Sequence, residues 1–147
     1  MATPYESAQL ILQLYEQRRE ECMRKARDFM FGWDPRSADE FMAGMMGENS
    51  AYIRMVFTYW DMAASLVLNG AIDSKMFLDA NGEQIAMFGK VEPYLPQLRQ
   101  IMPNPNFLKS LEGLCLSMPD GRQRIDKTRE FVRGIVEMRK AAGAAKA

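Results

Sequence analysis

The segment from Asn49 to Gly70 constrains this chain most, because it is apolar on almost every side. Residues at three-and-four spacing share one helix face, and the first such set is Ile53, Val56, Phe57, Trp60, Ala64 and Val67. A second face carries Tyr52, Met55, Tyr59, Met62 and Leu66, which leaves a narrow polar stripe of Arg54, Thr58, Asp61, Ser65 and Asn69. Such a helix belongs inside a bundle or a membrane, and its two charges favour the bundle. We predict an all-α, single-domain helical bundle with a central buried helix at about 50–69.

Helix boundaries are marked along the chain by capping residues and by glycine or proline stops. Thr3 to Glu6 forms a capping box, which predicts a helix over 4–31, and a second box at Ser37 opens a helix to about residue 46. Asp73 is expected to cap a turn at 74–79, and a helix over 83–102 should be kinked or restarted by Pro93. A short helix should run from a cap at Asn106 to 116, and a last helix over 121–142. We expect one domain spanning 1–147, in which 141–147 is a frayed tail.

Apolar stripes on the two longest predicted helices indicate which faces point inward. In the first helix the stripe consists of Tyr5, Ala8, Leu12, Tyr15, Cys22, Ala26 and Phe29. In the last helix it consists of Ile125, Thr128, Phe131, Val132, Ile135 and Met138. We expect both helices to pack beside the central helix and against each other.

Charge is distributed unevenly along a chain whose net charge is zero. Residues 34–92 carry nine acidic and four basic side chains, a net of −5, and residues 122–147 carry eight basic and three acidic, a net of +5. This asymmetry predicts that the last helix docks on the middle of the same chain or of a second copy. Basic residues are too sparse to predict a nucleic-acid contact.

The residues needed for common catalytic and metal chemistry are largely missing. The chain has no histidine, which removes the most frequent general base and zinc ligand, and its two cysteines, Cys22 and Cys115, lie far apart in the sequence. There is no phosphate-binding glycine loop and no nucleophile elbow. We therefore expect no enzyme activity, no cofactor and no metal. The lack of a signal peptide or transmembrane segment predicts a cytoplasmic protein with free thiols and no membrane contact.

Asp61 is the most informative polar residue, because it lies on the most buried predicted helix, where a charge needs a partner. Arg99 and Arg19 are the candidate partners in a structural ion pair. The alternative is a pocket, in which Asp61 would mark a small polar ligand. An apolar ligand would instead be lined by Trp60, Met62, Phe88 and Tyr94.

The middle of the chain resembles a group of uncharacterised bacterial helical proteins. The resemblance rests on the segments WDMAASLVLNGAID, EPYLPQLRQ and NPNFLKSLEGL, and covers about half of the chain. The shared positions are Trp60, Asp61, Gly70, Ile72, Asp73, Pro93, Arg99 and Glu112. One departure is that the group often has a tryptophan before the proline, a place that Phe88 takes here. The resemblance implies a helical fold and no particular activity.

Two classes of function follow from this pattern. The first is a non-enzymatic interaction or regulatory protein, whose partner is another protein or a second copy in a homodimer. Adaptable methionines at Met42, Met45 and Met46 would add exposed contact surface, and a dimer held partly by charge would weaken in salt. The second is a helical bundle that binds an apolar small molecule. An exposed apolar face favours the first class, and an enclosed cavity favours the second.

Overall fold

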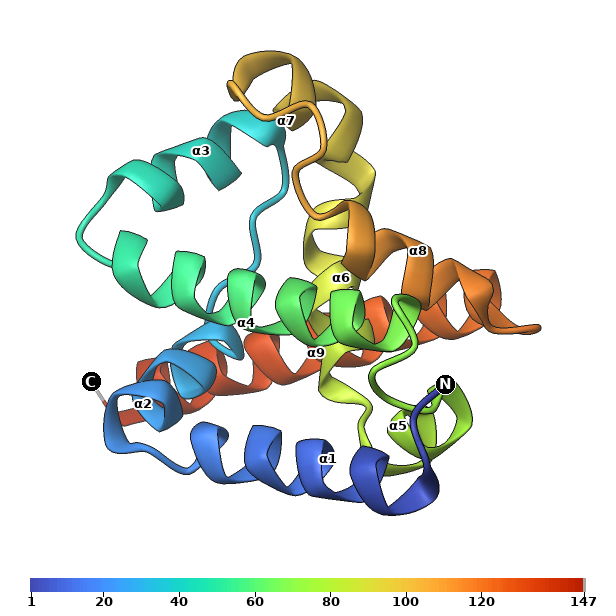
Figure 1. The fold of residues 1–147 in the computed structure, drawn as a ribbon. Coiled ribbons are helices and arrows are strands. Elements are labelled where there is room, and N and C mark those ends of the chain that lie inside the picture. The colour runs from blue at the N-terminus through green and yellow to red at the C-terminus, as the bar shows by residue number, and fades with distance from the viewer. Residues whose placement is uncertain (147) are drawn as a thin grey trace.

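The computed structural model describes residues 1–146 and is all-α, with no strand among those residues. In chain order the elements are α1 (Pro4–Arg18), α2 (Glu21–Met30), α3 (Ala38–Met46), α4 (Ser50–Leu68), α5 (Ser74–Ala80), α6 (Glu83–Val91), the 3₁₀ turn η1 (Glu92–Tyr94), α7 (Leu95–Ile101), α8 (Lys109–Ser117) and α9 (Gly121–Lys146). Figure 1 shows α4 in the middle of the molecule, α1 below it and α9 behind it.

The prediction of a central helix is confirmed, because α4 has α2, α3 and α8 packed against it. The prediction that the last helix packs beside α4 is wrong, because α9 packs mainly against α6 and α8. Its buried residues are Ile53, Val56, Phe57, Tyr59, Trp60, Ala63, Ala64 and Val67. They join one hydrophobic core that extends from Leu14 in α1 to Val132 in α9. Apolar burial of this kind is worth about 25 cal/mol per Å², so α4 supplies much of the driving force for folding.

Several predicted helix boundaries are confirmed by their hydrogen bonds. The Thr3 hydroxyl accepts from the Glu6 N–H at 3.1 Å, and the Glu6 carboxylate accepts from the Thr3 N–H at 2.9 Å, which completes the capping box. Asp73 accepts from the Met76 N–H and caps α5. Gly70 has φ +83°, the left-handed conformation that glycine tolerates where a helix ends.

The prediction of one helix over 4–31 is wrong, because the chain breaks between α1 and α2. The Glu20 carboxylate accepts hydrogen bonds from the backbone N–H groups of Cys22 and Met23, both at 2.9 Å, and so caps a new helix. These two bonds lower the pKa of Glu20. The local side-chain cap therefore prevails over the helical propensity of the surrounding residues.

The predicted inward stripe is also wrong for α1, which packs through a different face. Leu14 and Ser7 are its buried residues, and the Ser7 hydroxyl accepts from the Asp73 N–H at 2.9 Å. Tyr5 is 73% exposed, and Leu12 and Tyr15 are 64% and 53% exposed. The stripe that resembles a core face therefore lies on the outside of the molecule. Figure 1 shows α1 itself along the lower edge of the fold.

Proline positions determine the shape of the chain between α6 and α8. Pro93 ends α6 and starts η1, so the predicted restart is confirmed. The cap predicted at Asn106 is wrong: α8 begins after Leu108, which has φ +58° and no side-chain acceptor. The buried Leu108 side chain compensates for this strained backbone by joining the core.

The predicted docking of the basic last helix on the acidic middle is confirmed within one chain. The Glu92 carboxylate binds Arg122 at 2.9 Å and Arg129 at 2.6 Å, and Arg133 lies 3.5 Å from Asp34. The tail predicted to fray from residue 141 is helical through residue 146, since alanine favours helix. Residue 147 lies outside the described residues.

Candidate functional site

A polar junction connects α1, α2, α4 and α6 beside the central tryptophan. Arg27 binds Glu83 through Nη2 at 2.8 Å and through Nε at 3.0 Å, and the hydrogen bond raises the pKa of Arg27. The Trp60 indole N–H donates to the same carboxylate at 3.2 Å. Arg18 lies 5.1 Å from the centre of the Trp60 ring and donates to the Tyr59 hydroxyl. Every member has a partner, so this junction holds four helices together.

Asp61 has a different partner from the one predicted. Its carboxylate accepts from the Leu111 backbone N–H at 2.8 Å, and the described residues contain no ion pair between Asp61 and Arg99 or Arg19. Leu111 is the third residue of α8, and its N–H is one of those that a helix leaves without an intrahelical acceptor. Asp61 therefore supplies from α4 the cap that α8 lacks at its own N-terminus.

Arg99 is held by its own neighbours. It donates to the Phe107 carbonyl at 2.9 Å and to the Glu112 carboxylate at 3.3 Å. These contacts join α7, the following loop and α8. Arg99 and Glu112 thus form a structural pair. Both are among the shared positions on which the family resemblance rests.

The four residues of the predicted apolar pocket differ in burial. Trp60 and Phe88 belong to the core, Tyr94 is half-buried, and Met62 is exposed. The methionines of α3 also differ, since Met46 is exposed while Met42 and Met45 are half-buried against the core.

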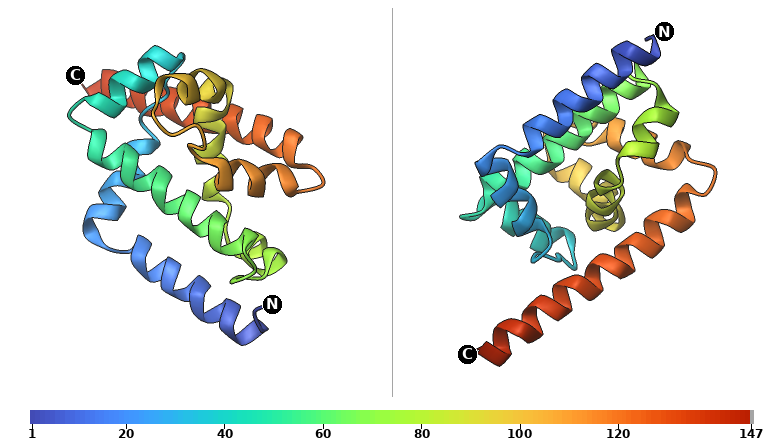
Figure 2. Two further views of the ribbon diagram at one scale, coloured as in Figure 1. Left: turned by 45° about the horizontal axis from the view of Figure 1, so that its top comes forward. Right: turned by 90° about the horizontal axis from the view of Figure 1, so that it is seen from below.

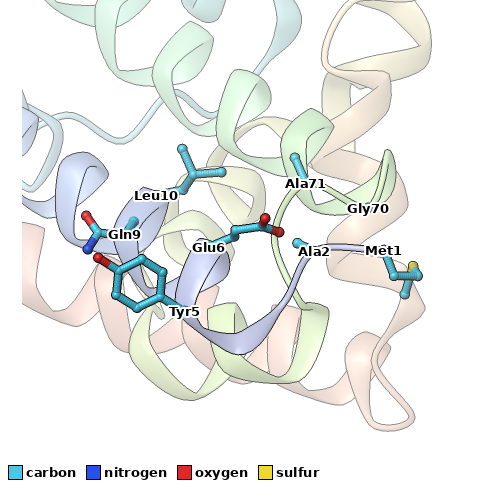
Figure 3. Close-up of a pocket in the computed structure, with 8 residues that line it drawn as sticks. All are labelled: Met1, Ala2, Tyr5, Glu6, Gln9, Leu10, Gly70 and Ala71. Atoms are coloured by element: carbon cyan, nitrogen blue, oxygen red, sulfur yellow. The ribbon is translucent and has the colours of Figure 1, made fainter.

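An apolar groove lies elsewhere, at the N-terminus. It has a volume of about 580 Å³, and its lining residues are Met1, Ala2, Tyr5, Glu6, Gln9, Leu10, Gly70 and Ala71. Figure 3 shows side chains of α1 on one side of this groove and the turn that follows α4, at Gly70 and Ala71, on the other. Its polar side chains are Glu6, which is occupied in the capping box, and Gln9.

Two rows of mostly apolar side chains lie on the surface, and all their members are exposed except the half-buried Ala8, Thr128 and Ile135. The α1 row consists of Tyr5, Ala8, Leu12 and Tyr15, and the α9 row consists of Thr128, Phe131, Ile135, Met138, Ala142 and Ala145. Phe131 is 71% exposed and Met138 is 73% exposed. Most of these residues belong to the predicted inward stripes, because an exposed row and a buried stripe have the same spacing. Only the position of each helix in the fold distinguishes the two.

Two titratable side chains, Lys90 and Cys115, are buried in the core. Lys90 is buried and donates to the Trp33 carbonyl at 2.7 Å, and burial lowers its pKa to about 8. Burial raises the pKa of the Cys115 thiol to about 12, which keeps it protonated, and Cys22 is an exposed free thiol. Within residues 1–146 no three acidic or cysteine side chains meet in a metal-binding arrangement.

The fold and these surfaces define an all-helical domain with a single core, a fully partnered polar junction and exposed apolar rows. The family model of a domain of unknown function (DUF4760) matches residues 5–118, and the chain belongs to this family. The family match ends before α9 begins. The chain matches no curated protein and no solved structure. Over the described residues, no helix combines the length and apolar character that crossing a membrane requires.

Proposed function

We propose that this protein acts without catalysis, as a helical interaction or regulatory protein that presents α1 to a helix of another protein. The observation that carries the proposal is the α1 row, in which Tyr5, Leu12 and Tyr15 are all more than half exposed. Their spacing is that of a helix-pairing surface, and aromatic side chains are frequent at the energetic centres of interfaces.

The surroundings of the α1 row support a protein partner. The row follows one face of a helix of 15 residues, which is about 22 Å long at 1.5 Å per residue. An amphipathic helix of similar length could lie along it with its own apolar face inward. Charged neighbours, including Glu16 and Arg19, pair with each other at 3.3 Å and would border such a contact.

Site-specific photo-crosslinking in the native host tests this proposal. A photoreactive amino acid at Leu12 lies within the row, and the same amino acid at the exposed neighbour Gln13 is the matched control. We expect one discrete protein adduct from position 12 and none from position 13. Tyr5→Glu and Tyr15→Glu should abolish that adduct, since each places a charge in the row. Equal adducts from both positions, or none from either, would overturn the proposal.

The apolar groove of Figure 3 favours a second candidate, a binding site for an apolar small molecule. The fluorescent probe 1-aminoanthracene tests it directly. Binding in the groove would saturate at one probe per chain and be lost in Leu10→Glu, because Leu10 lines the groove. Leu12→Glu, two residues away on the α1 row, is the control that should keep it. Unsaturable binding, or equal loss in both variants, would reject the groove as a site.

A further inference from the structure

The helix α1 contributes little of its surface to the core. Ser7 and Leu14 are its buried residues, although the helix has 15 residues. Leu10 and Ile11 pack against the core but stay partly exposed. Both views of Figure 2 show α1 at the edge of the fold, alongside α4. Because buried apolar surface is the main force that holds a helix in place, α1 is held more weakly than α4.

Hydrogen bonds attach α1 to the body near both of its ends. Towards the N-terminus, the Ser7 hydroxyl accepts from the Asp73 N–H at 2.9 Å. Towards the C-terminus, the Tyr59 hydroxyl donates to the Leu14 carbonyl and accepts from Arg18 at 3.2 Å. These bonds orient α1, but their loss is largely offset when α1 leaves the body, because the same groups then bind water.

The connection between α1 and α2 allows α1 to move while α2 stays in place. Arg19 and Glu20 alone separate the two helices. The Glu20 carboxylate caps α2 by accepting from the N–H groups of Cys22 and Met23. Since α2 has its own cap, it keeps its first turn without α1. The break at 19–20 is therefore placed as a hinge would be.

Aromatic side chains of the core lie beneath the C-terminal half of α1. The Arg18 guanidinium is 5.1 Å from the centre of the Trp60 ring, and Tyr59 binds α1 directly. The Trp60 ring lies 6.4 Å from the ring of Phe77 of α5, and both side chains are fully buried. Removal of α1 would expose this face of α4 to water.

We propose that α1 is a hinged strap, which opens as one unit about residues 19–20 while the rest of the chain stays folded. In the closed position the strap covers Tyr59 and Trp60. An isolated helix of this length is marginal in water, so the open strap should lose helical structure. Opening of this kind is a sub-global event, which requires less free energy than unfolding of the whole chain.

The strap deepens the proposed function and rests on it for its role. A partner that binds open α1 more tightly than closed α1 would shift the equilibrium towards the open form. Partner binding would then uncover the Tyr59 and Trp60 face of α4, so α1 would couple the two events. Opening is a property of the chain alone, whereas crosslinking from Leu12 requires the partner. The two proposals therefore fail separately.

Thiol labelling with iodoacetamide tests the strap in a Cys22→Ser background, which removes the exposed native thiol. Ser7→Cys places a nearly isosteric thiol at a fully buried position of α1, and the native Cys115 thiol of α8 is equally buried. Each rate is divided by the rate of the same thiol in urea-unfolded protein. We expect position 7 to react about tenfold faster than Cys115, or more. Equal relative rates would overturn the proposal.

Tyr59→Phe tests whether α1 opens as one unit. It removes the hydroxyl that binds Leu14 and Arg18, about two helical turns from position 7. The rate at position 7 should rise about fivefold, the usual effect of one lost hydrogen bond. Tyr52→Phe, at a half-buried position of the same helix, is the matched control that should leave this rate unchanged. An unchanged rate in Tyr59→Phe would mean that only the first turn of α1 frays, and would overturn the proposal.

Ile125→Val tests whether the body stays folded during opening. It removes one methylene group from the core side of α9 and should raise the rate at Cys115 about fivefold. The rate at position 7 should not change, because the body is intact in both the closed and the open form. Equal acceleration at both thiols would mean that α1 leaves only when the whole chain unfolds, which would exclude the strap.

Discussion

The indole N–H of Trp60 on α4 donates a hydrogen bond of 3.2 Å to the carboxylate of Glu83 at the start of α6. The same carboxylate binds Arg27 of α2, so one acidic side chain joins three helices. Trp60 thus contributes both apolar volume and a satisfied polar group to the core.

Trp60→Ala should lower the free energy of unfolding by about 3–5 kcal/mol, because it leaves a large cavity beside Phe77. Trp60→Phe keeps much of the ring and should cost less. Urea unfolding measures both, with Met62→Ala as the control on the exposed face of the same helix. A Trp60→Ala protein as stable as the control would contradict the placement of α4.

Asp61→Ala should cost about 1–2 kcal/mol, the usual effect of losing a helix cap. The larger cost of leaving a buried arginine unpaired is not expected, since Asp61 accepts from the Leu111 N–H. Asp61→Asn retains an acceptor oxygen and should lose less. Hydrogen exchange would show the change locally: the Leu111 amide should exchange faster in Asp61→Ala than in Asp61→Asn.

Gly70→Ala should destabilise the fold by about 1 kcal/mol through backbone strain, because residue 70 has φ +83°. Space is not the cause, since the nearest side-chain atom to an added Cβ is the Met1 sulfur at 3.6 Å. Gly134→Ala, inside α9, should instead stabilise by about 0.5–1 kcal/mol. Thermal unfolding at low protein concentration measures the stability of both variants. Stability changes of the same sign would contradict the left-handed conformation of residue 70 or the helical conformation of residue 134.

Stability should rise between pH 8 and pH 10.5 because of Lys90, whose pKa burial lowers to about 8 from 10.5. In this window the unfolded chain binds a proton at Lys90 that the folded chain has released, so raising the pH favours folding. The gain should reach about 3 kcal/mol at most. Below pH 8 both states hold the proton and Lys90 adds no pH dependence.

Lys90→Met supplies the comparison, because every other titrating group is common to the two proteins. Urea unfolding at pH 7.5, 9 and 10.5 should show the difference in stability shifting towards wild type as the pH rises. Parallel pH profiles would mean that Lys90 keeps its ordinary pKa in the folded state.

Helix boundaries set by local chemistry could be predicted from the sequence. Thr3, Ser37 and Asp73 each provide a side-chain acceptor within their own turn, and Gly70 marks a left-handed stop. The break at Glu20 has the same physical basis, but a glutamate amid helix-forming residues gives no distinct signal. The α8 boundary could not be predicted because its cap comes from α4, fifty residues earlier in the chain.

The site was less predictable than the fold for a related reason. Spacing identifies which residues share a face of α1 or α9, but the direction of that face depends on where the helix docks. Ser7 and Leu14 take the inner position on α1, and Leu12 is left outside. The partners of Asp61 and Arg99 include backbone groups, and every residue type carries such groups, so the sequence does not identify these partners.

Because of the position of α9, the family match and the packed core give different C-terminal boundaries for this domain. The family match stops at residue 118, yet Ile125, Val132 and Val136 lie beyond it and are buried. On α6, Gly89 lies so near Arg129 that an added Cβ would come within 3.4 Å of the arginine Cβ. A fragment cut at residue 118 would bare this face of α6 to water. The segment that the family model matches is therefore shorter than the segment that builds the packed core.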